Sequence, residues 1–144
     1  VIRALYAASN AGVTIHLSVR GACALRPGVP GLSTNIKVRS VIGRFLEHSR
    51  IFYFRNNNQH HVYLSSADWM DRNFFRRIEI CFPVLDSRLK KRVITEGLKP
   101  YLKDNVQAWE MDCNGHYKQK ASHRGKRFCA QEALLTKLVA AQQS

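Results

Sequence analysis

The sequence predicts a mixed α/β structure, in which strands and helices form layers around a hydrophobic core. Several short stretches alternate apolar and polar residues, as half-buried strands do. Other stretches repeat their apolar residues every three or four positions, as helices do. The hydrophobic content of 45% over 144 residues is enough for a folded core, and we expect a single domain that spans residues 1–144.

The first third of the chain predicts one helix and two strands. Residues 1–11 carry apolar residues at helical spacing, and Gly12 follows as a C-terminal stop. Residues 13–19 alternate without interruption and predict a strand. A loop with two prolines and two glycines is expected at 26–33, and residues 36–42 form the second alternating strand.

The middle of the chain predicts three more strands. After a short turn or helical piece at 44–47, strands are expected near 50–55 and 61–65. The asparagine-rich stretch 56–60 between them is suited to a hairpin loop. Residues 77–82 alternate isoleucine and phenylalanine with charged or small residues and predict another strand.

The last third predicts two helices, a strand and a loop. Asp86 is suited to cap the N-terminus of a helix that weakens at Gly97. Residues 105–111 are expected to form a last, edge-like strand, and residues 114–127 a basic loop that contains glycine. The apolar spacing of 128–141 predicts the final helix.

The charge of the chain is strongly positive, with 23 Lys and Arg against 10 Asp and Glu and a net charge of +13. Such an excess predicts a polyanionic partner: a nucleic acid, an anionic membrane, a nucleotide or a polyphosphate. The sign of the charge does not choose among these. No apolar run approaches the ~20 residues that cross a bilayer.

The cysteines and the N-terminus set two further expectations. The four cysteines lie far apart, without the spacing of zinc ligands, and we expect them to be reduced core residues. The chain begins at Val1, inside a predicted helix, and not with methionine. We therefore expect it to be a piece of a longer polypeptide, so that an active site shared with the remainder is only partly present.

The leading candidate site lies around His48, just before a predicted strand. Its imidazole exchanges a proton near neutral pH, and Arg50 adds a guanidinium fork suited to phosphate oxygens. Ser65 and Ser66 end the next predicted strand and offer hydroxyl donors. Asp68 follows them and is expected to orient a basic partner. The arrangement predicts half of a phosphoryl-transfer site.

Two arginines extend this candidate site. Arg20 ends a predicted strand and precedes Gly21, which lets a ligand approach the backbone closely. Ligands of open α/β sheets gather at the carboxyl ends of strands. Alternation sends Arg76 and Arg77 to opposite faces of a strand, so that at most one of them, taken as Arg77, is expected to face the site.

Other residues have ordinary structural interpretations. Trp69 is expected to pack at the rim or in the core, and Arg39 to be solvated. His60 and His61 are expected at the surface, because the hairpin supplies too few further ligands for a metal. Tyr117 is the lone Phe, Tyr or Trp of the basic loop, so stacking along a single-stranded nucleic acid has little support.

Five runs occur in a fixed order along nearly the whole chain: VRG at 19–21, LRPGVPG at 25–31, VRS at 38–40, GRFLEHSR at 43–50 and YLSSADWM at 63–70. Together they resemble the C-terminal domain of polyphosphate kinase, the type whose catalytic domains are similar to phospholipase D. The resemblance implies a phospholipase D-like mixed sheet flanked by helices.

The resemblance also implies an activity and its residues. Such enzymes reversibly transfer the terminal phosphate of ATP to inorganic polyphosphate through a phosphohistidine, and that histidine lies in a preceding domain absent here. His48 corresponds to a second histidine, which binds nucleotide phosphates and assists the leaving group, and Arg20 to a nucleotide-binding arginine. Arg50, Ser65, Ser66, Asp68 and Arg77 are candidates for further phosphate or polyphosphate contacts.

Cofactors, partners and location follow in the same way. The resemblance implies that magnesium (Mg2+) is bound by residues outside this chain, with no metal site within it, and that ATP is a substrate. It implies ATP, ADP and polyphosphate as partners, a homo-oligomer at full length and no specific nucleic acid. It implies a cytoplasmic location, with peripheral association at the inner membrane as a further option. The isolated chain is expected to be inactive.

Two features differ from related patterns and keep alternatives open. A phospholipase D motif places a lysine two residues after its histidine and an aspartate five further on, where this chain has Arg50 and Arg55. These differences argue against a phosphodiesterase or nuclease of that type, which is kept as the second hypothesis, and they fit the kinase branch. A polyanion-binding module explained by charge alone is the third. Asn57 and Asn58 stand where glycines are expected in this family.

Overall fold

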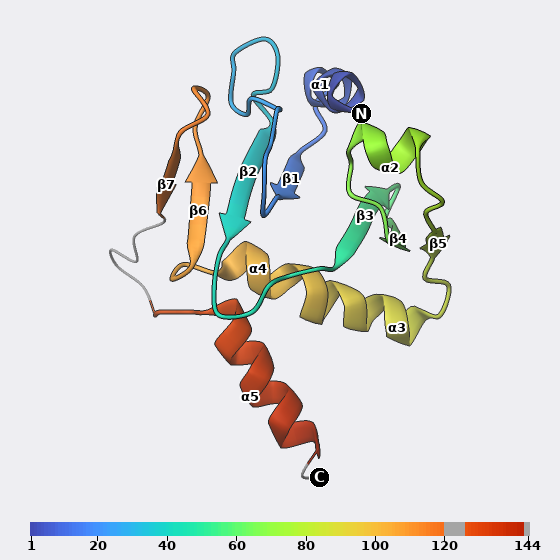
Figure 1. Cartoon of the computed structure of the whole chain (residues 1–144), viewed down its shortest axis with the longest axis vertical. Helices are drawn as coiled ribbons and strands as arrows, with labels where there is room; N and C mark the ends of the chain where they lie inside the picture. The colour runs from blue at the N-terminus through green and yellow to red at the C-terminus, as the bar shows by residue number, and fades with distance from the viewer. Residues whose placement is uncertain (120–125, 143–144) are drawn as a thin grey trace. The chain divides into compact units, whose positions relative to one another are not determined.

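The computed structural model of the chain describes residues 1–119 and 126–142 (Figure 1). Its helices and strands, in chain order, are α1 (Ile2–Asn10), β1 (Ile15–Ser18), β2 (Ile36–Val41), β3 (Arg50–Asn56), β4 (Gln59–Ser65), α2 (Asp71–Phe75), β5 (Cys81–Pro83), α3 (Ser87–Arg92), the π-helix η1 (Val93–Leu98), α4 (Lys99–Lys103), β6 (Ala108–Met111), β7 (Tyr117–Gln119) and α5 (Ala130–Gln142). This arrangement confirms the predicted α/β class.

The chain forms two compact units. Unit 1 comprises Val1–Leu46 and Tyr101–Ser144, and unit 2 comprises Glu47–Pro100. Each unit contains its own sheet. The expectation of a single domain over residues 1–144 stays a prediction.

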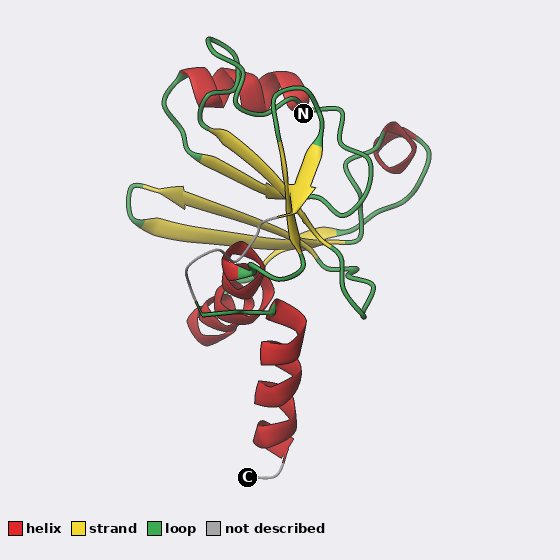
Figure 2. Ribbon diagram, turned by 90° about the vertical axis from the view of Figure 1, so that its left-hand side faces the viewer, coloured by secondary structure: helices red, strands yellow, loops and turns green. Residues whose placement is uncertain are grey.

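Unit 1 is built on a four-stranded sheet in the order β1-β2-β6-β7. β1 runs parallel to β2, whereas β2, β6 and β7 pair antiparallel. β6 therefore lies inside the sheet, and its predicted edge position is wrong because part of the expected basic loop forms β7. The rest of that expected loop, at 120–125, lies outside the described residues. Figure 2 shows α5 as one continuous helix, close to its predicted range.

The core of unit 1 lies between this sheet and the first helix. Leu25, Ile36 and Val38 are each only 2% exposed, and Leu5 and Tyr6 of α1 pack against them. Burial of apolar surface of this kind is the main favourable contribution to folding. The alternation that predicts β2 therefore corresponds to a real buried face.

Arg39 corrects one expectation, because it is buried and not solvated. Its Nη1 donates to the carbonyl oxygens of Tyr101 at 3.2 Å and Leu102 at 2.5 Å. Its Nη2 donates to Oε1 of Glu110 at 3.0 Å. The hydrogen-bond partners of the buried Arg39 side chain therefore come from two other elements, α4 and β6. Lys37, on the same strand, remains exposed.

Unit 2 is built on an antiparallel sheet in the order β3-β4-β5. The hairpin between β3 and β4 has a two-residue turn, since Asn56 pairs with Gln59. Asn57 and Asn58 both have positive φ, at 45° and 61°. A two-residue turn with positive φ at both positions matches the right-handed twist of the strands, and asparagine tolerates it better than most residues do. The hairpin is confirmed, with a shorter loop than predicted.

The strand predicted at 77–82 is wrong over most of its length. β4 ends at Ser65, which pairs with Cys81, so residues before Cys81 have no strand beside them to continue the ladder. Ile78 is fully exposed. The argument that placed Arg76 and Arg77 on opposite faces therefore fails, since Arg76 is the C-cap of the short helix α2.

The helical segment after β5 begins where the sequence predicts. Asp86 accepts hydrogen bonds from the backbone N–H groups of Arg88 at 2.9 Å and Leu89 at 2.8 Å. Gly97 does not end it, because the helix continues as η1 and then α4. A Cβ atom at Gly97 would lie 2.4 Å from Cδ1 of Ile51 on β3. Glycine therefore allows η1 to approach β3 closely.

Two further sequence expectations have structural outcomes. The four cysteines are free, as predicted, but Cys81 and Cys113 are exposed while Cys129 is buried. The core position predicted for all of them is thus wrong for at least those two. Across residues 1–119 and 126–142, no helix is both long enough and apolar enough to cross a membrane.

Candidate functional site

The two stretches on either side of the hairpin come together in unit 2. His48 is exposed in the segment before β3, and Arg50 is the first residue of β3. Nη1 of Arg50 donates to the carbonyl oxygen of His48 at 2.8 Å, and its Nε donates to Oδ1 of Asp68 at 3.0 Å. The guanidinium thus links the backbone of His48 to the turn that follows β4.

The register of the hairpin explains why the segment before β3 lies close to the turn after β4. Arg50 pairs with Ser65 across the two strands, so the residues just before β3 lie beside those just after β4. The hydrogen bond with Asp68 raises the pKa of Arg50, which stays protonated. The expectation that Asp68 orients a basic partner is met by this ion pair.

The two serines hold the turn together. Oγ of Ser65 donates to the carbonyl oxygen of Ile80 at 3.0 Å and accepts from the backbone N–H of Ala67 at 3.1 Å. Oγ of Ser66 donates to Oε2 of Glu79 and accepts from the backbone N–H of Ile80 at 3.0 Å. Each hydroxyl therefore donates its proton within the protein. Direct contact of these serines with phosphate stays a prediction.

Glu79 is the residue that sequence reasoning missed. Besides the bond from Ser66, it accepts one from Nδ2 of Asn73 at 2.6 Å on its other oxygen, Oε1. The hydrogen bonds from Ser66 and Asn73, with the charges of Arg77 and Arg50, lower the pKa of Glu79 below its ordinary value. The sequence offered one indication of Glu79, because it is an acidic residue that closely follows the basic pair Arg76 and Arg77.

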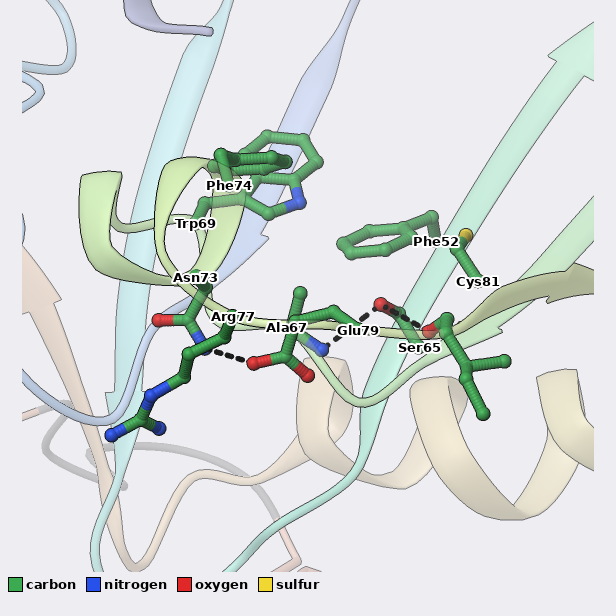
Figure 3. Close-up of a pocket in the computed structure, with 10 residues that line it drawn as sticks. Phe52, Ser65, Ala67, Trp69, Asn73, Phe74, Arg77, Glu79 and Cys81 are labelled. Atoms are coloured by element: carbon green, nitrogen blue, oxygen red, sulfur yellow. Dashed lines mark hydrogen bonds between the residues drawn. The ribbon is translucent and has the colours of Figure 1, made fainter.

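A pocket of about 320 Å³ lies beside this network (Figure 3). Its wall includes Phe52 and Trp69, whose rings stack with centroids 5.0 Å apart, which confirms the packing interpretation of Trp69. Figure 3 shows Asn73 and Glu79 joined by a hydrogen bond, with Arg77 beside them. The complete lining is Phe52, Ser65, Ala67, Trp69, Asn73, Phe74, Arg77, Glu79, Ile80 and Cys81.

Arg20 lies in unit 1, two residues after β1 ends at Ser18. Its side chain is exposed, and its carbonyl oxygen accepts a hydrogen bond from Oγ of Ser40 at 3.4 Å. The predicted position at the carboxyl end of a strand is confirmed. Its convergence with His48 on one nucleotide stays a prediction.

The described residues do not fit a metal site. In residues 1–119 and 126–142, no three His, Cys, Asp or Glu side chains gather in a metal-binding group. Near His48, the carboxylate of Asp68 is paired with Arg50, and that of Glu79 accepts bonds from Ser66 and Asn73. Magnesium ligands outside this chain stay a prediction.

Comparison with known proteins identifies the family. The profile described as "Polyphosphate kinase C-terminal domain 2" matches residues 1–131. The chain belongs to this family. Curated relatives named polyphosphate kinase are 59% identical over 137 residues in Burkholderia multivorans and 60% identical over 137 residues in Burkholderia lata. The match covers 95% of this chain and 20% of each relative, so the chain spans about a fifth of their length.

A solved structure agrees with the family assignment. The crystal structure of polyphosphate kinase from Porphyromonas gingivalis matches with a TM-score of 0.92 and 42% sequence identity. The match covers 99% of this chain and 22% of that one. The resemblance to the polyphosphate kinase C-terminal domain is confirmed, and with it the phospholipase D-like α/β fold.

Proposed function

We propose that this chain is the C-terminal catalytic part of a polyphosphate kinase, which reversibly transfers the terminal phosphate of ATP to inorganic polyphosphate. The observation that carries the proposal is the contact of Arg50 with the backbone of His48 and with Asp68, in a chain of this family. The chain spans about a fifth of its relatives' length, and, as the family resemblance implies, the phosphohistidine is proposed to lie in a preceding domain.

The proposed chemistry relies on positive charge and positioning. In phosphoryl transfer the protein contributes mainly by positioning the reactants and by stabilising negative charge on the transferring group with prearranged hydrogen-bond donors. His48 donates a hydrogen bond or proton to the leaving phosphate oxygen, and Arg50 adds a positive charge whose direction Asp68 fixes. Arg20 binds the nucleotide phosphates. Arg77, exposed beside the pocket, is proposed to contact polyphosphate.

The second hypothesis, a phospholipase D-like phosphodiesterase, has weaker support. Arg55, which stands where that motif has an aspartate, lies on β3 and donates to Oδ1 of Asn58 in the hairpin turn at 2.7 Å. Release of nucleotides from DNA by the intact protein would favour this hypothesis. The third hypothesis, a basic polyanion-binding module, rests on the net charge of +13 alone.

Partners and location complete the proposal. ATP, ADP and polyphosphate are the proposed partners, with a homo-oligomer at full length. The cytoplasm is the proposed location, with peripheral association at the inner membrane as its variant. These statements rest on the family, whose members named above are polyphosphate kinases.

His48→Ala in the intact enzyme tests the proposed function. We expect polyphosphate synthesis from ATP to be nearly abolished while circular dichroism and thermal unfolding stay unchanged, because His48 is exposed and its loss leaves the fold intact. His60→Ala is the matched control, since His60 is also exposed but lies on the hairpin. Synthesis at the wild-type rate by His48→Ala would reject the role of His48.

A further inference from the structure

Glu79 joins two parts of unit 2 that are separate in the sequence. Its Oε2 accepts from Ser66 in the turn after β4, and its Oε1 accepts from Asn73 in α2. Asn73 is only 5% exposed. Glu79 itself lies in the segment between α2 and β5, which has no neighbouring strand. The carboxylate therefore connects the turn, the helix and this segment.

The turn held by Glu79 carries the partner of Arg50. Ser66 is two residues before Asp68, and Asp68 accepts from Nε of Arg50 at 3.0 Å. The same guanidinium donates to the carbonyl oxygen of His48 at 2.8 Å. A continuous chain of contacts thus leads from Glu79 through the turn to the backbone of His48.

The two donors on Glu79 suit a carboxylate, which has an accepting oxygen for each. The side chains of Ser66 and Asn73 both donate to it, one to each oxygen. A glutamine has one oxygen and one amide nitrogen, so it could accept from only one of the two side chains, and the Ser66 hydroxyl would have to turn and accept from the amide. A carboxylate is also a poor direct partner for phosphate, because the two charges repel. Glu79 therefore acts on the protein and not on the substrate.

We propose that Glu79, with Asn73 as its buried support, is a positioning residue that fixes the Ser65–Asp68 turn and thereby aims Arg50 and His48 at the transferring phosphate. The inference rests on the proposed function for its catalytic consequence. Displacing a catalytic group by about 1 Å lowers the rate by about 100-fold, so loss of Glu79 is expected to lower kcat although it touches no substrate.

A double-mutant cycle in the intact enzyme tests the proposal. Glu79→Gln and Ser66→Ala are each expected to lower kcat for polyphosphate synthesis by about 10- to 100-fold. The double variant should be no slower than the slower single variant, because both changes break one shared contact. Glu132→Gln, at an exposed position of α5, is the matched control and should keep the wild-type kcat.

Two outcomes of the cycle would overturn the proposal. If the two effects multiply, Ser66 has a role of its own, such as direct phosphate contact, and does not act with Glu79. If Glu79→Gln lowers only the melting temperature while kcat per folded molecule is unchanged, Glu79 is merely structural. Should Glu79→Gln fail to fold, Asn73→Ala replaces it, and the same two criteria apply.

A crystal structure of intact Glu79→Gln separates this inference from the proposed function. Nε of Arg50 is expected to withdraw from Asp68, with the turn displaced. An unchanged turn and ion pair would overturn the inference, whatever the activity. If the wild-type enzyme makes no polyphosphate, the proposed function fails, while the structural comparison still decides whether Glu79 positions Arg50.

Discussion

Arg39 and Arg50 both lie on strands, each between a serine and an apolar residue, yet they have different environments. Arg39 is in β2, which has a strand on each side, and it is 8% exposed. Arg50 is in β3, at the edge of its sheet, and it is half-buried. Arg39 donates to Glu110 and to two backbone carbonyl oxygens of α4, whereas Arg50 donates to Asp68 and to one backbone carbonyl oxygen. Alternation alone does not reveal these partners.

The pH dependence of stability tests the state of Glu79. Its folded pKa lies below its ordinary value of 4.5, so the unfolded chain takes up a proton more readily. The contribution of Glu79 to stability is therefore complete above that ordinary value and is lost as the pH falls through the folded pKa. We expect the melting temperatures of the wild type and Glu79→Gln to converge on acidification. Parallel curves down to low pH would contradict the lowered pKa.

Among the helices, the contact between η1 and β3 depends on one missing methyl group. Gly97→Ala would place Cβ 2.4 Å from Cδ1 of Ile51. We expect it to destabilise the protein by about 1 kcal/mol, because overpacking outweighs the better helix propensity of alanine.

A second substitution isolates that cause. Ile51→Val removes Cδ1, so in this background Gly97→Ala should no longer destabilise, which chemical denaturation of all four proteins would measure. An equal cost of Gly97→Ala in both backgrounds would show that the close approach is not responsible.

The elements that could be predicted are those whose signal is local. Alternation and turn residues predict β2, β3 and β4, and the carboxylate of Asp86 predicts the start of α3. β7 and the shortened β5 could not be predicted, because a strand requires a partner that sequence alternation does not show. The five-residue helix α2 has no side-chain cap at Met70 that would have marked its start.

The residues of the candidate site also differ in whether a local sequence signal reveals them. The proximity of His48, Arg50 and the serines could be predicted, because the hairpin fixes which residues lie opposite one another, whereas their roles stay predictions. Glu79 and Asn73 could not, since their contact depends on the path of an irregular segment. The family-derived position of Arg20 relative to His48 stays a prediction.

At the scale of the whole molecule, the excess of 23 basic over 10 acidic residues attracts any polyanion. We expect the affinity of the intact enzyme for short polyphosphate to fall steeply as salt rises, because counterions compete for the same charges. Part of the competition between ATP and polyphosphate is expected to depend on Arg20 and not on net charge, and Arg20→Ala should abolish that part. Titration of the enzyme with short polyphosphate, with and without ATP and at two salt concentrations, measures both the salt dependence and the competition.

A matched substitution separates specific from general binding. Arg3→Ala removes the same charge from an exposed position of α1. It should weaken binding slightly and leave the competition with ATP intact. If Arg3→Ala and Arg20→Ala behave alike, Arg20 has no special role in nucleotide binding and charge alone explains the attraction.

The seven residue pairs of the β3–β4 hairpin connect its tip to the pairing of Arg50 with Ser65. One residue inserted into only one of the two strands would shift every pair between the insertion and the open end of the hairpin. It would also turn the displaced side chains to the opposite face of the sheet. Ser65 would then no longer stand across from Arg50. Length variation in this hairpin is therefore tolerable when both strands grow together or when the change stays within the tip, and single-strand insertions would separate the halves of the site.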